Sequence, residues 1–481
     1  MTAPKLIEPQ DRLLLLQDLT TLQSDADDAV QKDPKWFLLL DAHKRALRIE
    51  TMIVRGGRGA GRSALFDFLQ HVASNPSLID TAGIQLPAST WVEGFTNSPS
   101  HPALESMGSF GQQANELERR SFWLAWLCSR LAETSSESKN SFLKISSGFG
   151  VKDPKTLATL GAAHVQELSD WLDSLNESRV NTTPFVVTYD RLDRMGSDPS
   201  EMIVSLLQLW LNLSDRYRFI RAKIFIREDL FQKSLFAFPD ASKLDARSIS
   251  IDWQVQDLYR VLIKHMANTS ERLREWIESS INKVPLKNEG LMGWTPPSPL
   301  QVSGRPSQKS FVDHLAGEKM GAAAKKGFTY TWIPNRLQDA HSRVVPRSML
   351  ALIRNAAQEA INRGPTARYL RLLEPEELQF ALNKTSIRRV AEVREEFEAI
   401  ARLANLKGEN VLLQRSVAVK KLRGPIRGGD KDRFGEDGEA VLMAAIEQGV
   451  MSARSDGRID VPDIYREAFG ILRKGGVKRP T

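Results

Sequence analysis

A cluster of glycines directly after a short apolar segment constrains this chain more than any other feature of its sequence. Residues 51–54 are apolar and β-prone, and the glycine-rich run from Gly56 to Gly61 stops them at once. From Ser63 to Val72, apolar residues recur at helical spacing. This order of strand, glycine loop and helix predicts a turn whose backbone N–H groups point inward, as they do around bound phosphate.

The glycine loop has the spacing of a Walker A motif, with arginine in the usual lysine position. Arg62 would face the β- and γ-phosphates of ATP, and the Ser63 hydroxyl would bind Mg²⁺. The helix that follows would add the positive end of its dipole. A guanidinium is wider than an ammonium, so we expect binding to be more secure than fast hydrolysis. The predicted nucleotide-binding residues are Gly56, Gly57, Arg58, Gly59, Ala60, Gly61, Arg62, Ser63 and Ala64.

A second apolar segment, residues 185–189, ends in the carboxylate of Asp190 and has the form of a Walker B strand. Asp190 would hold the hydration shell of the Mg²⁺ ion. Asp193 follows closely and is a second candidate for the chemistry. The alternative is that Asp190 only caps the end of its strand.

Further strand candidates alternate with helical segments, which predicts a parallel sheet covered on both faces. The strands are expected at 89–92, 184–189, 222–226 and 248–251, and the helices at 112–132, 162–175 and 200–212. Residues 134–154, rich in Ser, Lys and Gly, are expected to form an exposed insertion. The predicted fold is therefore α/β, a parallel-sheet P-loop NTPase core with a helical lid and a small C-terminal winged-helix-like domain.

The chain of 481 residues is too long for one ordinary core, and changes of pattern divide it into four parts. These are an N-terminal helical segment (1–45), a P-loop domain (46–255), a helical lid (256–385) and a C-terminal helical or winged-helix-like domain (386–481). Within them we expect helices at 36–45, 311–320, 347–363 and 387–406, a connector at 290–307 and a charged loop at 424–438.

Two arginines are positioned where they could contact the γ-phosphate. Arg227 ends the strand 222–226, and the carboxyl ends of parallel strands line the ligand crevice. Arg347 follows a proline at the start of a helix, which makes it a stiff cation that could reach back from the lid. The alternatives are a surface salt bridge of Arg227 with Glu228 or Asp229, and an exposed helix-start position for Arg347.

Taken together, these motifs resemble the STAND and KAP-like ATPases, relatives of the AAA+ class, over about residues 46–365. The resemblance implies a five-stranded parallel core and ATP-dependent assembly, with Arg227 in the sensor-one role and Arg347 in the sensor-two role. Many bacterial members act in antiviral defence or stress signalling. Many related ATPases place a glutamate directly after the Walker B aspartate, to polarise the attacking water. Here Arg191 stands in that position, so Asp193 could substitute or catalysis could be slow.

The C-terminal region carries most of the excess positive charge. The formal net charge is +7, and residues 401–481 hold sixteen lysines and arginines against eleven acids. A helix from Glu439, a hairpin turn at Gly457 and a second helix are compatible with a winged-helix module, with Arg454 and Arg458 on the wing. A plain helical cap would also fit. Because acids and bases alternate here, we expect protein contact and only weak, non-specific, salt-sensitive nucleic-acid binding.

Composition excludes several classes of protein. Cys128 is the only cysteine, so disulfide frameworks and cysteine-based metal sites are excluded. The seven histidines show no metal-binding spacing. No apolar run is long enough to span a bilayer and the N-terminus lacks a secretory pattern, so we expect a soluble, cytoplasmic protein without membrane contact.

Three functional hypotheses remain open. The first is an ATPase switch that forms homo-oligomers and controls a separate protein effector. The second is a DNA-associated ATPase of replication, transposition or segregation. The third is a pseudo-ATPase that binds nucleotide and serves as a scaffold. Arg62 and Arg191 favour this third hypothesis over the first.

Overall fold

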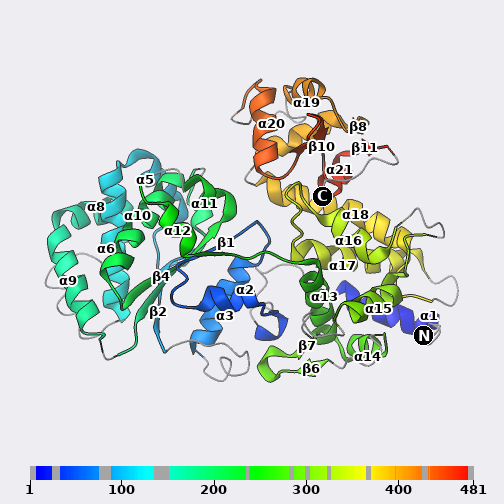
Figure 1. Ribbon diagram of the computed structural model, residues 1–481, viewed down its shortest axis with the longest axis horizontal. Coiled ribbons are helices and arrows are strands. Elements are labelled where there is room, and N and C mark those ends of the chain that lie inside the picture. Colours follow the sequence, from blue (N-terminus) through cyan, green and yellow to red (C-terminus); the bar gives the residue numbers. More distant parts are fainter. Residues whose placement is uncertain are drawn as a thin grey trace. The chain divides into compact units, whose positions relative to one another are not determined.

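The computed structural model describes residues 7–23, 33–74, 88–134, 151–180, 182–196, 198–234, 238–280, 286–297, 304–321, 327–364, 370–395, 397–424, 432 and 434–474. The chain forms two compact units, Leu39–Asp252 and Met1–Leu38 with Trp253–Thr481 (Figure 1). The four-part division expected from sequence stays a prediction. The helix α18 runs without a break through residues 385 and 386, where one of those boundaries was placed.

A five-stranded sheet in the order β2-β3-β4-β1-β5 forms the centre of the first unit, and every neighbouring pair of strands is parallel. All five expected strands are present. β3 is buried along its whole length, as expected of a strand that is covered on both faces. The strands are β1 (Ile53–Gly56), β2 (Thr90–Phe95), β3 (Phe185–Tyr189), β4 (Ile220–Arg227) and β5 (Ser248–Ser250).

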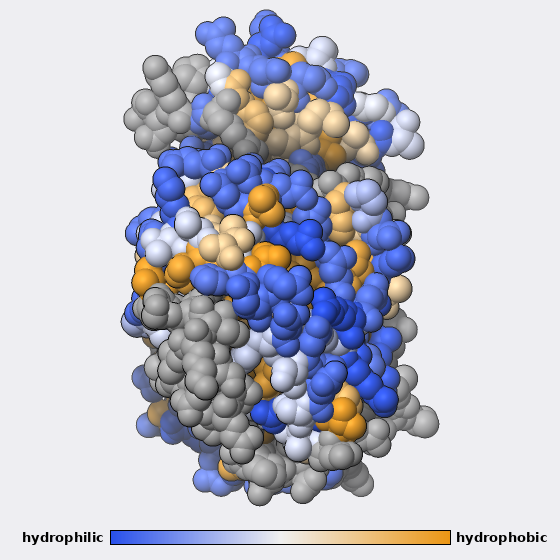
Figure 2. All heavy atoms as spheres, turned by 90° about the vertical axis from the view of Figure 1, so that its left-hand side faces the viewer, coloured by the Kyte–Doolittle hydropathy of each residue, from blue (hydrophilic) through white to orange (hydrophobic). Residues whose placement is uncertain are grey.

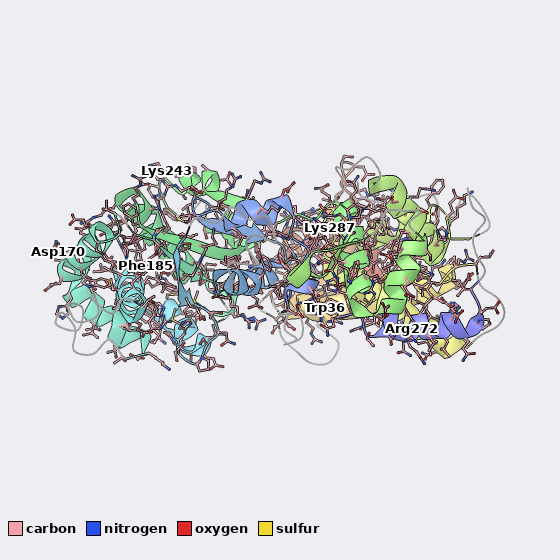
Figure 3. All side chains as sticks on the ribbon, turned by 90° about the horizontal axis from the view of Figure 1, so that it is seen from below. Trp36, Asp170, Phe185, Lys243, Arg272 and Lys287 are labelled. Carbon is pink, nitrogen blue, oxygen red and sulfur yellow. The ribbon has the colours of Figure 1, made fainter. Side chains whose placement is uncertain are left out.

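Helices flank this sheet, which confirms the predicted α/β class (Figure 1). Phe185 lies inside the unit, whereas Asp170 and Lys243 lie at its periphery (Figure 3). The helices are α2 (Asp41–Leu47), α3 (Arg62–Ser74), α5 (Leu104–Gln113), α6 (Glu116–Thr134), α8 (Pro154–Ala163), α9 (Val165–Glu177), α10 (Ser200–Arg216), α11 (Glu228–Ser234) and α12 (Ser242–Ala246).

Three helix predictions in the first half of the chain need correction. The helix expected at 36–45 is a single 3₁₀ turn, η2 (Pro34–Trp36), then extended residues, then α2. The helix expected at 112–132 is broken because Asn115 and Glu118 cap the start of α6 reciprocally, each side chain accepting from the other's backbone N–H. The helix expected at 162–175 is two helices, α8 and α9, that meet at His164. Most of the insertion expected at 134–154 lies outside the described residues.

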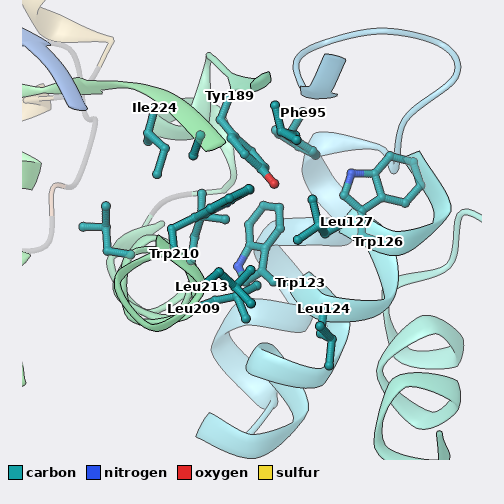
Figure 4. Close-up of a cluster of buried hydrophobic side chains, with 14 of the residues drawn as sticks. Phe95, Trp123, Leu124, Trp126, Leu127, Tyr189, Leu209, Trp210, Leu213 and Ile224 are labelled. Carbon is teal, nitrogen blue, oxygen red and sulfur yellow. The ribbon is translucent and has the colours of Figure 1, made fainter. Parts of the chain in front are cut away.

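A cluster of aromatic side chains packs around Tyr189, the last residue of β3 (Figure 4). Trp123 and Trp210 both contact the ring of Tyr189 edge-on, with centroids 5.9 and 6.0 Å away. The indole N–H of Trp123 also donates to the carbonyl of Met202, at 2.9 Å. Edge-to-face pairs of this kind contribute roughly 0.5–1.5 kcal/mol each beyond area burial, so they fix the end of the strand from which Asp190 projects.

The second unit is mainly helical, as expected after Trp253. Arg12 joins its N-terminal helix to the rest through a buried ion pair with Glu377, at 2.9 Å. The connector expected at 290–307 contains β7, which forms a short hairpin with β6, and the start of α15. The elements are α1 (Pro9–Thr20), α13 (Val255–Thr269), α14 (Glu271–Ser280), β6 (Lys287–Asn288), β7 (Trp294–Thr295), α15 (Gly304–Ala316), α16 (Thr329–Leu337), α17 (Pro346–Arg363) and α18 (Pro375–Arg394).

The C-terminal part of this unit combines short helices with a hairpin, as the winged-helix-like prediction requires. Strands β9 and β10 are antiparallel, and Leu413 bridges to Ile459 beside them. The helix expected at 387–406 was wrong in its second half, because α18 ends at Arg394 and a 3₁₀ helix follows. The elements are η6 (Glu398–Leu406), β8 (Asn410–Val411), α19 (Arg415–Leu422), α20 (Gly438–Glu447), β9 (Ser452–Ala453), β10 (Ile459–Asp460), α21 (Asp463–Phe469) and β11 (Leu472–Arg473).

The surface drawn in Figure 2 is mainly polar, as expected of a chain in which 26% of the residues are charged. Among the coloured residues of the face drawn in Figure 2, hydrophilic ones predominate, and hydrophobic ones lie between them, with one group gathered near the top of the view. Among the described helices, none has the length and apolar character needed to cross a membrane.

Candidate functional site

The glycine loop connects β1 to α3, as the sequence predicts. Gly59 and Gly61 have φ angles of +79° and +92°, in the left-handed region that favours glycine. Gly56 has another reason to be glycine, because a Cβ there would lie 3.3 Å from the Cβ of Ala60 and 3.4 Å from Cγ of Arg62. The loop backbone is thus held in a tight turn at the N-terminus of a helix, where anions bind readily.

The sheet order places this loop at a topological switch point. The chain leaves β1 for the far edge strand β2, returns through β3 to β4, and then crosses β1 to reach β5. Ligands of open α/β sheets bind in the crevice at the carboxyl ends of the strands at such points. Gly56 and Arg227 are register partners on β1 and β4, so the loop begins directly beside Arg227.

Asp190 follows β3 at this same edge and is only 2% exposed. Its backbone N–H donates to the carbonyl of Phe95, at 2.9 Å, which ties the end of β3 to β2. Burial raises the pKa of the Asp190 carboxyl to about 6, although the positive charge of Arg62 works against this shift. A buried carboxylate with an elevated pKa is poised to accept a cation.

Arg62 and Asp193 form an ion pair, with Nη2 of the arginine 3.4 Å from Oδ2 of the aspartate. Both side chains are largely buried, at 13% and 17% exposure. Arg191 makes this approach possible, because its φ of +59° turns the chain after Asp190 into the 3₁₀ turn η3 (Leu192–Arg194). The structure therefore brings Arg62, Asp190 and Asp193 into one cluster of charges.

Arg227 lies at the end of β4 and donates two hydrogen bonds to Asp229, Nε to Oδ1 at 3.0 Å and Nη2 to Oδ2 at 2.7 Å. The salt-bridge alternative was right about the partner and wrong about the setting, because Arg227 is buried. Burial works to raise the pKa of Asp229, but the charge and hydrogen bond of Arg227 outweigh it, with help from Arg62, and the pKa is lowered. Sequence reasoning gave Asp229 no role at the site, although it stands two residues from Arg227.

Arg347 belongs to the second unit. It lies at the start of α17, as expected, and its guanidinium is 3.4 Å from the carboxylate of Glu392 on α18. Its side chain is 23% exposed, so it is partly buried rather than an exposed arginine at the helix start. Its role toward nucleotide stays a prediction.

The donor set at the loop fits Mg²⁺ better than a metal held by protein alone. Within the described residues, no group of three or more His, Cys, Asp or Glu side chains could hold a metal ion. Mg²⁺ commonly binds through one or two protein oxygens, with phosphates and water completing its shell. The Ser63 hydroxyl and the Asp190 carboxylate are hard oxygen donors of this kind.

Comparison with known proteins gives few matches. No protein-family model matches the chain, and no curated protein matches it. A Walker-type ATPase of Pyrococcus abyssi, PABY2304, is similar with 13% identity and a TM-score of 0.36, over 89% of this chain and 94% of that one. The ORC2 protein of Aeropyrum pernix, solved as ADPNP and ADP complexes, is similar with 11% identity and a TM-score of 0.29, over 88% of this chain and 90% of that one.

At these low values the likenesses carry no weight in the assignment, which rests on the chain's own geometry. A parallel five-stranded sheet, a glycine loop between its first strand and a helix, and a buried aspartate at the end of a nearby strand define the class. The chain has the α/β fold of the P-loop nucleotide-binding proteins.

Proposed function

We propose that this protein binds ATP with Mg²⁺ at the loop Gly56–Ser63 and hydrolyses it slowly. The observation that carries the proposal is the cluster of Arg62, Asp190 and Asp193 beside a left-handed glycine loop. A tight strand-to-helix turn without a ligand would not need two acids and an arginine gathered at its rim.

Each residue has a chemical role in this proposal. The loop amides and the N-terminus of α3 hold the phosphates, and Ser63 and Asp190 hold Mg²⁺, which neutralises charge on the phosphates. Asp193 orients the attacking water in place of the absent glutamate. Hydrolysis is slow because Arg191 stands where that glutamate is usual, and because the planar guanidinium of Arg62 fits a moving phosphoryl group poorly.

We further propose that nucleotide makes the protein a switch or scaffold that forms homo-oligomers and controls a separate protein effector. The resemblance of the motifs to STAND and KAP-like ATPases supports this role, and it supports antiphage defence in bacteria as the setting. Arg227, beside the loop, supports a state that depends on the γ-phosphate.

Calorimetric titration with Mg·ATP tests the binding site. We expect Arg62→Ala and Ser63→Ala each to weaken binding at least tenfold, about 1.4 kcal/mol, because each loses a phosphate or metal contact. Arg216→Ala is the matched control, since this arginine forms an exposed pair with Asp173 on the same unit. Unchanged affinity in both loop variants would refute the site.

Turnover tests the proposed slow hydrolysis. We expect the wild-type rate to lie well below about 10 per second, a typical enzyme value, and Arg62→Lys to preserve or raise it. The compact ammonium would follow the γ-phosphoryl group better than the guanidinium. A wild-type rate near the typical value would contradict the proposed slow hydrolysis. A lower rate in Arg62→Lys would contradict the role given to the guanidinium.

A DNA-associated ATPase is the second candidate, favoured by the winged-helix-like arrangement of α19, α20 and the β9–β10 hairpin. The hairpin arginines weaken it, because Arg454 pairs with Asp460 and Arg458 pairs with Asp456. Cations neutralised by their own hairpin have little charge left for phosphate. Mobility-shift assays at near-physiological salt should show only weak, non-specific binding. Tight binding to one sequence, lost in Arg454→Ala with Arg458→Ala, would promote this candidate.

A further inference from the structure

The carboxyl end of β4 carries a buried, two-bond pair between Arg227 and Asp229. The side chains are 9% and 22% exposed, so water screens the pair only weakly. A guanidinium holds a carboxylate and a phosphate in the same forked geometry. The hydrogen-bonding edge that Arg227 gives to Asp229 is therefore the edge that a phosphate would use.

Asp229 also acts on the second arginine of the site. The charge of Arg62 contributes to the lowered pKa of Asp229, so the carboxylate lies within the field of both arginines. Arg62 is itself paired with Asp193, at 3.4 Å. Arg62 and Arg227 are thus each compensated by a carboxylate of the same unit.

The position of Arg227 makes this compensation relevant to the nucleotide. Arg227 is the register partner of Gly56, the first residue of the loop. Its strand lies between the strand that carries the loop and the strand that ends at Asp190. A polyanion in the loop would lie close to a guanidinium that Asp229 already occupies.

We propose that Asp229 is an internal competitor of the γ-phosphate, whose carboxylate occupies Arg227 until ATP displaces it. This inference rests on the proposed ATP binding and names the residue that sets the preference for ATP over ADP. Because ADP lacks the γ-phosphate, it leaves the pair between Arg227 and Asp229 closed. The energy needed to open the pair is drawn from ATP binding alone.

Asp229→Asn tests the proposal, because asparagine keeps the shape of the side chain and removes its charge. In the full-length protein with Mg²⁺, we expect affinity for a non-hydrolysable ATP analogue to rise about tenfold, equal to 1.4 kcal/mol. Affinity for ADP should change less than about twofold. Asp456→Asn is the matched control, since Asp456 also pairs through two bonds with an arginine two residues away, in the C-terminal hairpin. It should change neither affinity.

Thermal unfolding gives a second test, because the variant should be less stable than the wild type without nucleotide although it binds ATP more tightly. Without nucleotide, Asp229→Asn should melt below the wild type, because a buried arginine loses its charged partner. With the ATP analogue, its rise in melting temperature should exceed that of the wild type. If the variant does not fold, Asp229→Glu, whose longer arm disturbs the two-bond geometry, should show a smaller gain for ATP in the same direction.

The outcomes separate this inference from the proposed function. Equal changes for ATP and ADP, or weaker ATP binding, would overturn the competitor role while leaving the nucleotide site intact. A wild-type protein that binds neither nucleotide would overturn the proposed function and this inference with it.

Discussion

Arg62 shows how one side chain can serve two sets of partners. In the Walker A position it would face phosphate, yet in this structure it pairs with Asp193 and lowers the pKa that burial alone would give Asp190. The acids thus hold the guanidinium in place without nucleotide. The ionised form of Asp190 is destabilised, because its negative charge is buried and the positive charge of Arg62 compensates it only in part.

Asp190→Asn should stabilise the nucleotide-free protein, and more so at high pH. The folded-state pKa of Asp190, about 6, lies above its ordinary value of 3.8, so ionisation costs stability as the pH rises through this window. The cost is about 3 kcal/mol at pH 8 and about half of that at pH 5. Urea unfolding in EDTA at both pH values measures the difference. A variant that is less stable than the wild type at pH 8 would contradict the assignment of this shift to burial.

At the scale of elements, a buried lysine joins the sheet to the helix before it. Lys223, on β4, donates from Nζ to three backbone carbonyls, those of Ala46 at 2.6 Å, Arg48 at 2.9 Å and Thr51 at 2.8 Å. These carbonyls belong to the end of α2 and the segment that leads into β1. The three bonds fix the entry of the strand that carries the glycine loop.

Lys223→Met should destabilise the protein by roughly 2–4 kcal/mol, because it leaves three carbonyls near the core without their donor. Lys243→Met is the control, since that lysine is 53% exposed and its loss should cost less than about 0.5 kcal/mol. Chemical unfolding compares the two variants. Equal stability of both would show that the carbonyls find other donors and that the lysine does not hold the strand.

At the scale of the whole molecule, the proposed nucleotide site raises the question of what a bound nucleotide would change. The chain combines a P-loop unit with a mainly helical unit whose last elements are short helices and the β9–β10 hairpin. A slow ATPase, as proposed above, would be suited to hold a state for long periods rather than to perform work continuously. Self-association is the most direct expression of such a state.

ATP should promote self-association, and ADP should not. The physical reason is that ATP brings a γ-phosphate, an additional anionic partner for the arginines of the site, and ADP does not. The two nucleotides should therefore leave different charges at the surface near the loop. Mass photometry with ATP, ADP and no nucleotide measures the effect, with Arg62→Ala as the control that should stay unassembled. The same mass in all three conditions would argue against ATP-dependent assembly and favour the third hypothesis, a pseudo-ATPase whose nucleotide has a structural role only.

Much of the fold followed from local patterns. The glycine loop, the five strands and the α/β class came from the sequence because a buried parallel strand and a phosphate-type turn need particular residues within a few positions. The failures were also local in origin. The apolar residues 37–40 fit a helix by composition, but they are extended in the structure, with Leu38 and Leu40 buried.

The sequence by itself determined the loop, the strand that ends in Asp190 and the class of fold, since the residue patterns behind each lie close together in the chain. Only the tertiary structure decided which charges meet. The pairing of Arg62 with Asp193, 131 residues apart, depends on the order of strands in the sheet and on the turn at Arg191. The same holds for Asp229, because the sequence shows its proximity to Arg227 but not the burial of the pair or its place beside Gly56. Burial and strand order are properties of the packed molecule, and no local pattern encodes them.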